Sequence, residues 1–337
     1  MPHPDWSSLE LYVMEEHIED YNLGFIGRRE LLRKVTLITG SLAITLAVLP
    51  ALGCNPAPTG TGASPAAGSA ANRTPSPTAV ATAASTDFAV PPAARTTDGI
   101  TVKADDPRIV AAAAQPKGAA DGFAMTGYLA RPKADGKYPG MLVIHENRGV
   151  TEHIRDVVRR AATAGFTALT IDLLSRKGGA DGLGDAYSAE IAKTSPDAMV
   201  ADLKAALDFL KAQSSVKADA IAVTGFCFGG GMVWSLLAAG GDLKAAAPFY
   251  GPIPQSPAGL GTTKAAVSAV YAETDTRITS TAPQIEELLK RAGRPYKLTT
   301  YPGVGHAFHN DTGSAYNADQ AQKAWIATIQ WFRQYAV

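Results

Sequence analysis

The chain lacks the features that mark several large classes of protein. It has only two cysteines among 337 residues, Cys54 and Cys227, which offer neither a disulfide framework nor a cysteine-rich zinc module. Its 31 basic and 31 acidic side chains balance to a net charge of zero, so the composition indicates no surface for nucleic acid. Zinc-ligand and phosphate-loop patterns are also absent from the sequence, and we expect no metal and no cofactor.

Charge is scarce in much of the N-terminal third, which divides into two parts. Residues 55–99 consist mainly of Ala, Pro, Thr, Ser and Gly, a composition that cannot bury a core and predicts a flexible linker. Residues 1–54 contain an uncharged, largely apolar stretch from Val35 to Gly53 and predict a signal or anchor segment. Residues 100–337 are numerous enough for one hydrophobic core, and we expect them to fold as a single, monomeric domain.

Export of the chain is indicated by residues 28–54. Arg28 and Arg29, followed by two leucines, resemble a twin-arginine (Tat) signal. Cys54, in the run Ala-Leu-Gly-Cys, resembles the cleavage and lipidation site of a bacterial lipoprotein. The apolar stretch is also long enough to span a bilayer. Three alternatives remain open: a lipid anchor on Cys54, an uncleaved membrane anchor, or a cleaved secreted form. Each places the chain at the cell envelope, in the periplasm or outside the cell.

A short helix is the simplest interpretation of the acidic stretch from Glu10 to Tyr21, which is unusual for the start of a signal segment.

A glycine-flanked cysteine is the most informative motif of the chain. The run Gly225-Phe226-Cys227-Phe228-Gly229-Gly230 directly follows apolar residues 220–224. It predicts a strand, a tight turn and a helix with the thiol at the apex, which is the nucleophile elbow with Cys in place of Ser. The helix N-terminus favours a thiolate. The alternative is a buried structural cysteine in a tight turn.

An acid and a histidine follow this cysteine along the chain. Asp275 and His306 each come just after the end of a predicted strand. Nucleophile, acid and histidine in that order are typical of α/β-hydrolases, and the carboxyl ends of parallel strands meet at one edge of a sheet. The sequence therefore predicts a Cys-His-Asp triad, with Glu273 as the alternative acid. His145 and His309 are expected to be structural.

Helical spacing of apolar residues supports the same layering of the domain. It recurs in four segments: 154–162, 199–210, 285–292 and 321–332. Strands that alternate with such helices imply a mostly parallel sheet with helices on both faces. The Gly- and Asp-rich segment 176–194 is predicted to be a loop or lid over the site.

A family resemblance rests on three motifs. G-F-C-F-G-G, H-E-N-R-G at residues 145–149 and P-G-V-G-H-A-F at residues 302–308 resemble the dienelactone hydrolase family (carboxymethylenebutenolidases). The resemblance covers residues 123–337. It implies an α/β-hydrolase fold and hydrolysis of a small carboxylic ester or lactone through a thioester. The alternatives are a non-catalytic binding module on the same fold and an acyltransferase that uses the same triad.

The resemblance also implies roles for single residues. Six positions match the family's catalytic set: the nucleophile Cys227, the base His306, the orienting acid Asp275, the thiol-activating carboxylate Glu146, and the oxyanion-hole backbone donors Phe228 and Asn147. A free thiol has a pKa of about 8.5, so a base beside it is needed to supply thiolate at neutral pH.

Substrate recognition departs from the family in one respect. Arg176 falls where the family carries an arginine that binds a substrate carboxylate, but the second such arginine is replaced by Asn310. Arg148, and also Arg277, are candidates to compensate, and a solvated surface charge is the alternative for each arginine. We therefore expect the substrate to be a small ester or lactone and leave its identity open.

Overall fold

The computed structural model describes residues 6–54 and 88–336. Most of the predicted linker, residues 55–87, lies outside the described residues. Residues 88–99, which were assigned to the linker, instead pack on the domain. Phe88 is buried, and the Ala89 carbonyl accepts a hydrogen bond from the indole of Trp325 at 3.0 Å. The folded domain therefore includes these residues, because an apolar anchor follows the low-complexity stretch.

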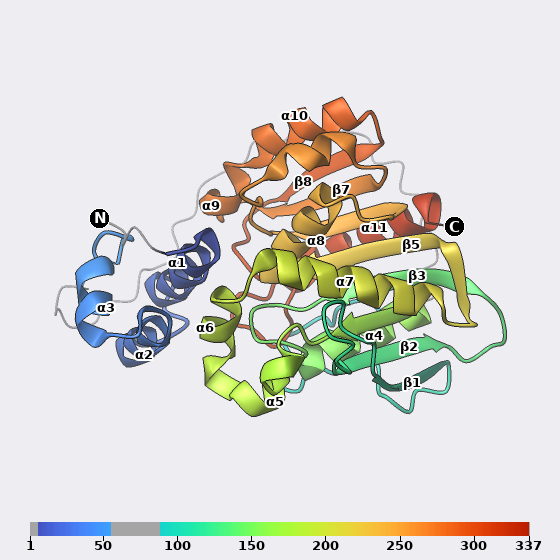
Figure 1. Ribbon diagram of the computed structural model, residues 1–337, viewed down its shortest axis with the longest axis horizontal. Coiled ribbons are helices and arrows are strands. Elements are labelled where there is room, and N and C mark those ends of the chain that lie inside the picture. The colour runs from blue at the N-terminus through green and yellow to red at the C-terminus, as the bar shows by residue number, and fades with distance from the viewer. Residues whose placement is uncertain (1–5, 55–87, 337) are drawn as a thin grey trace.

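A mixed sheet of eight strands occupies the centre of the described domain (Figure 1). The strand order is β1-β2-β4-β3-β5-β6-β7-β8. Strand β2 runs antiparallel to both of its neighbours, β1 and β4, and all other neighbouring pairs are parallel. The strands are β1 (Ile109–Ala114), β2 (Gly127–Pro132), β3 (Tyr138–Ile144), β4 (Thr167–Ile171), β5 (Val216–Phe226), β6 (Ala245–Phe249), β7 (Ala266–Ala272) and β8 (Tyr296–Tyr301). This arrangement confirms the α/β-hydrolase fold expected from the sequence.

Helices cover both faces of the sheet. Helices α4 (Glu152–Thr163) and α11 (Ala318–Tyr335) pack on one face, and α7 (Pro196–Lys211) and α8 (Phe228–Ala238) pack on the other (Figure 1). Helices α9 (Thr276–Thr279) and α10 (Ala282–Ala292) follow β7, and the 3₁₀ helix η3 (Pro257–Thr262) lies between α8 and α10. The four segments with helical spacing all lie in these long helices.

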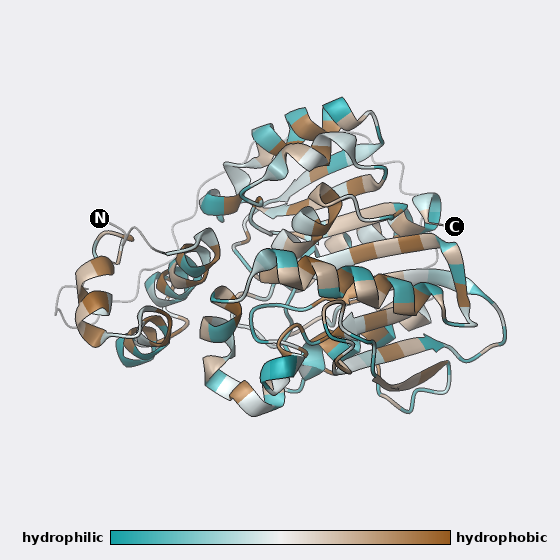
Figure 2. Ribbon diagram, in the orientation of Figure 1, coloured by the Kyte–Doolittle hydropathy of each residue, from teal (hydrophilic) through white to brown (hydrophobic). Residues whose placement is uncertain are grey.

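Helix α7 illustrates how the sequence produces its element. Ser195 caps the helix through its side chain, and Pro196 begins it, where a missing N–H costs nothing. Met199, Leu203 and Leu207 are buried on one face of the helix. Figure 2 shows polar and apolar residues alternating along α7 and α10, whereas the central strands are mostly apolar. A strand that is buried on both faces needs such a continuous apolar run.

The segment predicted as a loop or lid is instead a chain of short helices. They are η1 (Ser175–Lys177), α5 (Gly179–Leu183), η2 (Gly184–Ala186) and α6 (Tyr187–Ala192). Helix α6 packs against the N-terminal helices. No residue of segment 176–194 lines the cavity that contains Cys227. The lid interpretation was therefore wrong in its position, because these residues support a cover that comes from elsewhere in the chain.

Three helices precede the domain and lie beside it: α1 (Ser8–Asn22), α2 (Arg28–Thr39) and α3 (Leu42–Val48) (Figure 1). Ser7 and Glu10 form a reciprocal capping box at the start of α1. Within the described residues, no single helix is both long and apolar enough to cross a membrane. Helices α2 and α3 reach that length and hydropathy only together, and they meet at a bend of 108°.

Candidate active site

Cys227 occupies a tight turn between β5 and α8. Its backbone has φ 58° and ψ −125°, a conformation that L-residues rarely adopt, and the residue forms the N-cap of α8. A Cβ atom at Gly225 would lie less than 3.0 Å from the backbone of Gly229. A Cβ atom at Gly229 would meet the Ile144 carbonyl equally closely. The glycines of the motif are therefore required by close backbone approach, as the sequence predicted.

Asp275 and His306 come together at the same edge of the sheet. Asp275 follows β7 and is fully buried, and His306 lies in the loop after β8. The Asp275 Oδ2 and His306 Nδ1 atoms are 2.6 Å apart. The alternative acid Glu273 instead accepts a hydrogen bond from the Gly303 backbone at 2.8 Å. The structure thus places Asp275, and not Glu273, against the histidine.

The Cys227 thiol is deeply buried beside this pair. The residue exposes 2% of its surface, and burial raises the pKa of the thiol to about 12, with the nearby Glu16 adding to the rise and His306 opposing it. Although burial lowers the pKa of His306, Asp275 and the thiol together raise it well above its usual range. Burial therefore favours the neutral thiol, whereas Asp275 increases the tendency of His306 to take the thiol proton.

Backbone strain in the described chain is concentrated around these groups. Cys227, Tyr250 and Ala307 are its only non-glycine residues with positive φ. The ring centroid of Tyr250 lies 5.0 Å from that of His306, and Ala307 is the next residue along the chain from His306. Strained backbone tends to persist where the surrounding structure holds functional groups in place. All three positions border the candidate triad.

Glu146 lies in the loop that follows β3 and lines the same cavity as Cys227. It is buried, and its Oε2 accepts a 2.6 Å hydrogen bond from Asn310, the residue that replaces the family's second arginine. Burial raises the pKa of Glu146 above its usual range. Asn147 is the next residue in this loop, and Phe228 is the first residue of α8, so both backbone N–H groups belong to segments that meet at Cys227.

The two histidines that were expected to be structural, His145 and His309, have different surroundings. His145 hydrogen bonds to the Glu146 carbonyl at 2.6 Å and to the Leu173 N–H at 3.2 Å, so it fixes the loop that carries Glu146. His309 stacks on Phe226 with ring centroids 4.8 Å apart, and neither of its nitrogens has a partner. Burial lowers the pKa of His309 well below its usual range.

The three arginines differ in their relation to the site. Arg176 forms ion pairs with Asp121 at 2.8 Å and with Asp202 at 2.5 Å, and it does not line the cavity at Cys227. This placement does not support the carboxylate-binding role expected for Arg176. Arg148 lines that cavity. Arg277 lies 3.5 Å from Asp275 and also pairs with Glu19 of α1.

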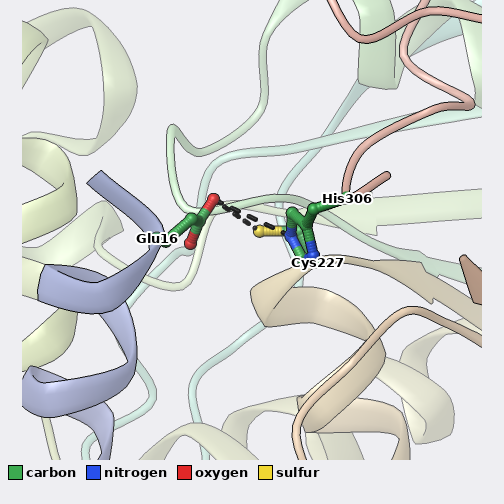
Figure 3. A group of neighbouring side chains, drawn as sticks. All are labelled: Glu16, Cys227 and His306. Atoms are coloured by element: carbon green, nitrogen blue, oxygen red, sulfur yellow. Dashed lines mark hydrogen bonds and ion pairs between the residues drawn. The ribbon is translucent and has the colours of Figure 1, made fainter. Parts of the chain in front are cut away.

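Helix α1 supplies two further side chains that sequence reasoning missed. The Glu16 Oε1 accepts a hydrogen bond from the Cys227 thiol at 3.1 Å and lies 3.9 Å from the His306 Nε2 (Figure 3). The Tyr12 hydroxyl is 3.7 Å from the Cys227 sulfur and 3.5 Å from the same imidazole nitrogen. The only signal in the sequence was the unusual acidic stretch from Glu10 to Tyr21, and nothing in it indicated the long-range contact.

A cavity of about 550 Å³ opens beside the thiol between α1 and the domain. One wall is acidic and comes from α1, with Glu16, Glu19 and Asp20 among its residues. The domain contributes Arg148, Asn310 and the candidate triad residues Cys227 and His306 to the lining of the same cavity. The volume is appropriate for a small organic substrate.

One group of side chains in the described chain has the spacing of metal ligands. Ligand atoms of Glu16, Cys227 and His306 all lie within 4.8 Å of one another (Figure 3). Thiolate, imidazole and carboxylate are ligands that zinc prefers, and Asp275, which accepts a hydrogen bond from the His306 Nδ1–H, resembles the outer partner of a zinc-bound histidine. Two of the three ligands are candidate catalytic groups, so an ion here would compete with the nucleophile.

Comparison with known proteins shows which family this chain belongs to. The sequence profile of the dienelactone hydrolase family matches residues 125–336. The chain belongs to the dienelactone hydrolase family. A putative carboxymethylenebutenolidase of Methylorubrum extorquens is 35% identical over 223 residues, which cover 62% of this chain and 77% of that protein. One of Salmonella typhi is 33% identical over 225 residues, covering 63% and 83%.

Solved structures agree with this assignment. A putative dienelactone hydrolase from Klebsiella pneumoniae matches with a TM-score of 0.61 and 30% identity, over 67% of this chain and 99% of that one. This dienelactone hydrolase family member is thus a hydrolase of the carboxylic ester class. Its catalytic part corresponds to the whole of a solved relative, whereas α1, α2 and α3 lie outside the matched family profile.

Proposed function

We propose that the protein hydrolyses a small carboxylic ester or lactone through a Cys227-His306-Asp275 triad. The observation that carries the proposal is the 2.6 Å contact between Asp275 and His306 at the edge of the sheet where the elbow presents the Cys227 thiol. Each group has a distinct task in acyl transfer. Cys227 is the nucleophile, His306 moves the proton, and Asp275 holds the imidazole in one tautomer and stabilises its protonated form.

Acylation begins when His306 takes the thiol proton. The thiolate then attacks the carbonyl carbon, and the negative charge that develops on oxygen is stabilised by the backbone N–H groups of Phe228 and Asn147. Removal of one such donor costs about 3–4 kcal/mol in a well-studied hydrolase. Collapse of the intermediate breaks the carbon–oxygen bond, and the leaving alkoxide takes the proton from His306. A lactone opens at this step and stays attached as a thioester.

Deacylation restores the free thiol. His306 removes a proton from water, which attacks the thioester carbonyl, and the same two backbone donors stabilise the second intermediate. Its collapse releases the carboxylic acid, and the departing thiolate regains the proton from His306. The net reaction consumes one water molecule and yields an acid and an alcohol, which remain in one molecule when the substrate is a lactone.

Glu146 and Arg148 are proposed to affect thiol reactivity and substrate binding, respectively. We propose that Glu146, held by Asn310, lies close enough to the thiol to assist its deprotonation, because burial gives this carboxyl group a raised pKa and makes it a stronger base than usual. Arg148 gives the cavity a positive charge on the domain side. A substrate that carries a carboxylate near its ester or lactone group fits this charge, and the curated relatives are named for such a butenolide.

The experiment compares turnover of p-nitrophenyl acetate and of dienelactone by wild type and Cys227→Ala. Residues 88–337 are the appropriate domain, since residues 88–99 are part of the fold. Turnover that disappears in Cys227→Ala, with melting temperature changed by only a few degrees, supports the proposal. Equal turnover by both proteins, or unfolding of the variant, would contradict the nucleophile assignment.

We also propose that residues 1–54 direct export and tether the chain to a membrane. The support is the twin-arginine sequence at Arg28 and the lipoprotein-like site at Cys54. Deletion of residues 1–54 should move the protein from the membrane fraction to the soluble fraction. Retention of Cys54→Ala at the membrane would exclude the lipid anchor and leave the uncleaved anchor.

A further inference from the structure

Helix α1 is packed onto the mouth of the active site and not exposed beside it. Tyr12, Val13, Met14, His17 and Ile18 are all buried. Hydrogen bonds and ion pairs hold this end of the chain at several points: His17 to Ser188 at 3.3 Å, Lys193 to the Leu37 carbonyl at 2.8 Å, and Arg33 to Asp185 at 2.9 Å. The short helices of segment 175–192 therefore form the support on which α1 and α2 rest.

The acidic side chains of α1 complement arginines of the domain that lie near it. Its 15 residues include five acidic side chains and neither Lys nor Arg. Three of them, Glu16, Glu19 and Asp20, line the cavity, which Arg148 and His306 also line. Glu19 also forms an ion pair with Arg277, and the Arg277 guanidinium lies 5.7 Å from the centre of the Tyr12 ring. The acidic helix thus pairs with Arg277 and shares the cavity with Arg148, while the domain side of the cavity also carries Glu146 and Glu152.

The contacts of α1 occupy the positions that an ester would need. A near-attack geometry requires the acyl carbon to approach the nucleophile to about 3–3.5 Å. The Glu16 carboxylate already lies 3.1 Å from the Cys227 sulfur. The Tyr12 hydroxyl, 3.5 Å from the His306 Nε2, lies beside the nitrogen that must exchange the proton. A substrate whose acyl carbon approaches the thiol would therefore have to displace the Glu16 carboxylate.

We propose that the mouth of the active site is a binding surface for an acidic helix, and that α1 is its intramolecular occupant and inhibitor. Glu16 caps the thiol, Tyr12 covers the imidazole, and the Glu19–Arg277 pair holds the helix in register. The enzyme turns over only when α1 leaves. This inference rests on the proposed function for its effect on turnover, but the accessibility of the thiol can be measured without any substrate.

The position of α1 in the sequence suggests how the inhibition is relieved. Helices α1, α2 and α3 all precede Cys54, the predicted cleavage site. Cleavage there removes the whole covering segment in one step and leaves the domain intact. The precursor is then inactive, and the cleaved form is active, so that hydrolysis is confined to the compartment where cleavage occurs.

Charge reversal at Glu19 is the direct test in the full chain. Glu19→Lys replaces the ion pair with a repulsive contact to Arg277 and touches neither the thiol nor the histidine. Glu30→Lys is the matched control, because Glu30 is an exposed residue of α2 whose nearest cation, Lys34, is 3.9 Å away. We expect Glu19→Lys to increase the rate of Cys227 alkylation by iodoacetamide about tenfold or more, as a shift of about 1.4 kcal/mol in the closed state would give. Glu30→Lys should match wild type.

A second experiment uses the helix itself. A synthetic peptide of residues 6–26 should slow both alkylation and ester turnover by residues 88–337, and a peptide with Glu16→Lys and Glu19→Lys should not. If Glu19→Lys and removal of α1 both leave the alkylation rate unchanged, the inhibition is refuted. If residues 88–337, which lack α1, are alkylated faster than the full chain but hydrolyse the ester more slowly, α1 is a wall of the substrate site and not an inhibitor. Increased alkylation with no turnover of any ester refutes the hydrolase proposal alone.

Discussion

At the scale of single residues, the site depends on one short contact between Asp275 and His306. Burial of Asp275 tends to raise the pKa of this carboxyl group, but the charge and hydrogen bond of His306 outweigh that and hold its pKa below the usual range. The carboxylate therefore stays ionised and fixes the imidazole with Nδ1–H toward it. In the proposed mechanism, the other nitrogen accepts the thiol proton.

Asp275→Asn should therefore leave the fold intact and remove most of the activity. An amide stabilises the wrong imidazole tautomer, and the equivalent change in a serine protease lowers kcat by about 10⁴-fold. We expect a loss of about 10³–10⁴-fold in kcat for residues 88–337, measured with p-nitrophenyl acetate. Glu273→Gln, two residues away and bonded to Gly303, is the control and should lose less than about threefold. Equal losses in the two variants would contradict the assignment of the acid.

The arginines make a second prediction at this scale. Arg148 lines the cavity, whereas Arg176 is engaged by Asp121 and Asp202. Arg148→Ala should raise KM for a carboxylate-bearing lactone about tenfold and leave KM for p-nitrophenyl acetate nearly unchanged, since a charged hydrogen bond contributes about 1.5–3 kcal/mol. Arg176→Ala should leave both KM values unchanged. A selective rise in Arg176→Ala would restore the role expected from the sequence.

At the scale of elements, the strand–turn–helix at Cys227 positions the proposed nucleophile. Periodicity and the glycine motif predicted this unit, the parallel sheet and the four long helices correctly, because those features arise from local pattern. The position of α1 and the ion pairs of Arg176 were not predicted. They depend on contacts between segments far apart in the sequence, such as Glu16 with Cys227, which no local pattern encodes.

Gly229→Ala tests the close packing of this unit. The added methyl group would meet the carbonyl oxygens of Ile144 and His145, which are backbone atoms and have little freedom to move. We expect a loss of about 3 kcal/mol or more in the free energy of unfolding, or no soluble protein. Gly182→Ala in α5 is the control, since nothing lies within 4 Å of its added Cβ, and it should be neutral or slightly stabilising. Both are measured by denaturant unfolding.

At the scale of the whole molecule, a buried ion network connects α4 to the C-terminal loops and to the chain that enters the domain. The Asp311 carboxylate contacts His153 at 2.6 Å and Arg160 at 2.7 Å, and the Thr96 N–H donates to the Asp311 carbonyl at 2.7 Å. Burial alone would raise the pKa of Asp311, but His153 and Arg160 outweigh it and hold that pKa well below the usual range.

This network predicts how stability depends on pH. A carboxyl group with a lowered folded pKa contributes stability that is present above its unfolded pKa, about 3.9, and is lost as the pH falls toward the folded value. Asp311→Asn should therefore flatten the fall in stability below about pH 4 and lower the free energy of unfolding at pH 7 by about 3–5 kcal/mol, the usual effect of breaking a buried ion pair. The unfolding of both proteins at low pH is measured by circular dichroism. If Asp311→Asn unfolds at the same pH as wild type, the prediction is contradicted.

With the proposed triad and the proposed covering helix, the molecule carries a hydrolase site that α1 shields. The most direct test of the central claim, that Cys227 is the acyl acceptor, is mass spectrometry of residues 88–337 quenched in acid during turnover of p-nitrophenyl acetate. We predict one acetyl group on the peptide that contains Cys227, sensitive to hydroxylamine at neutral pH and absent from Cys227→Ala. Undiminished turnover in Cys227→Ala, or an acetyl group only on other residues, would contradict the account.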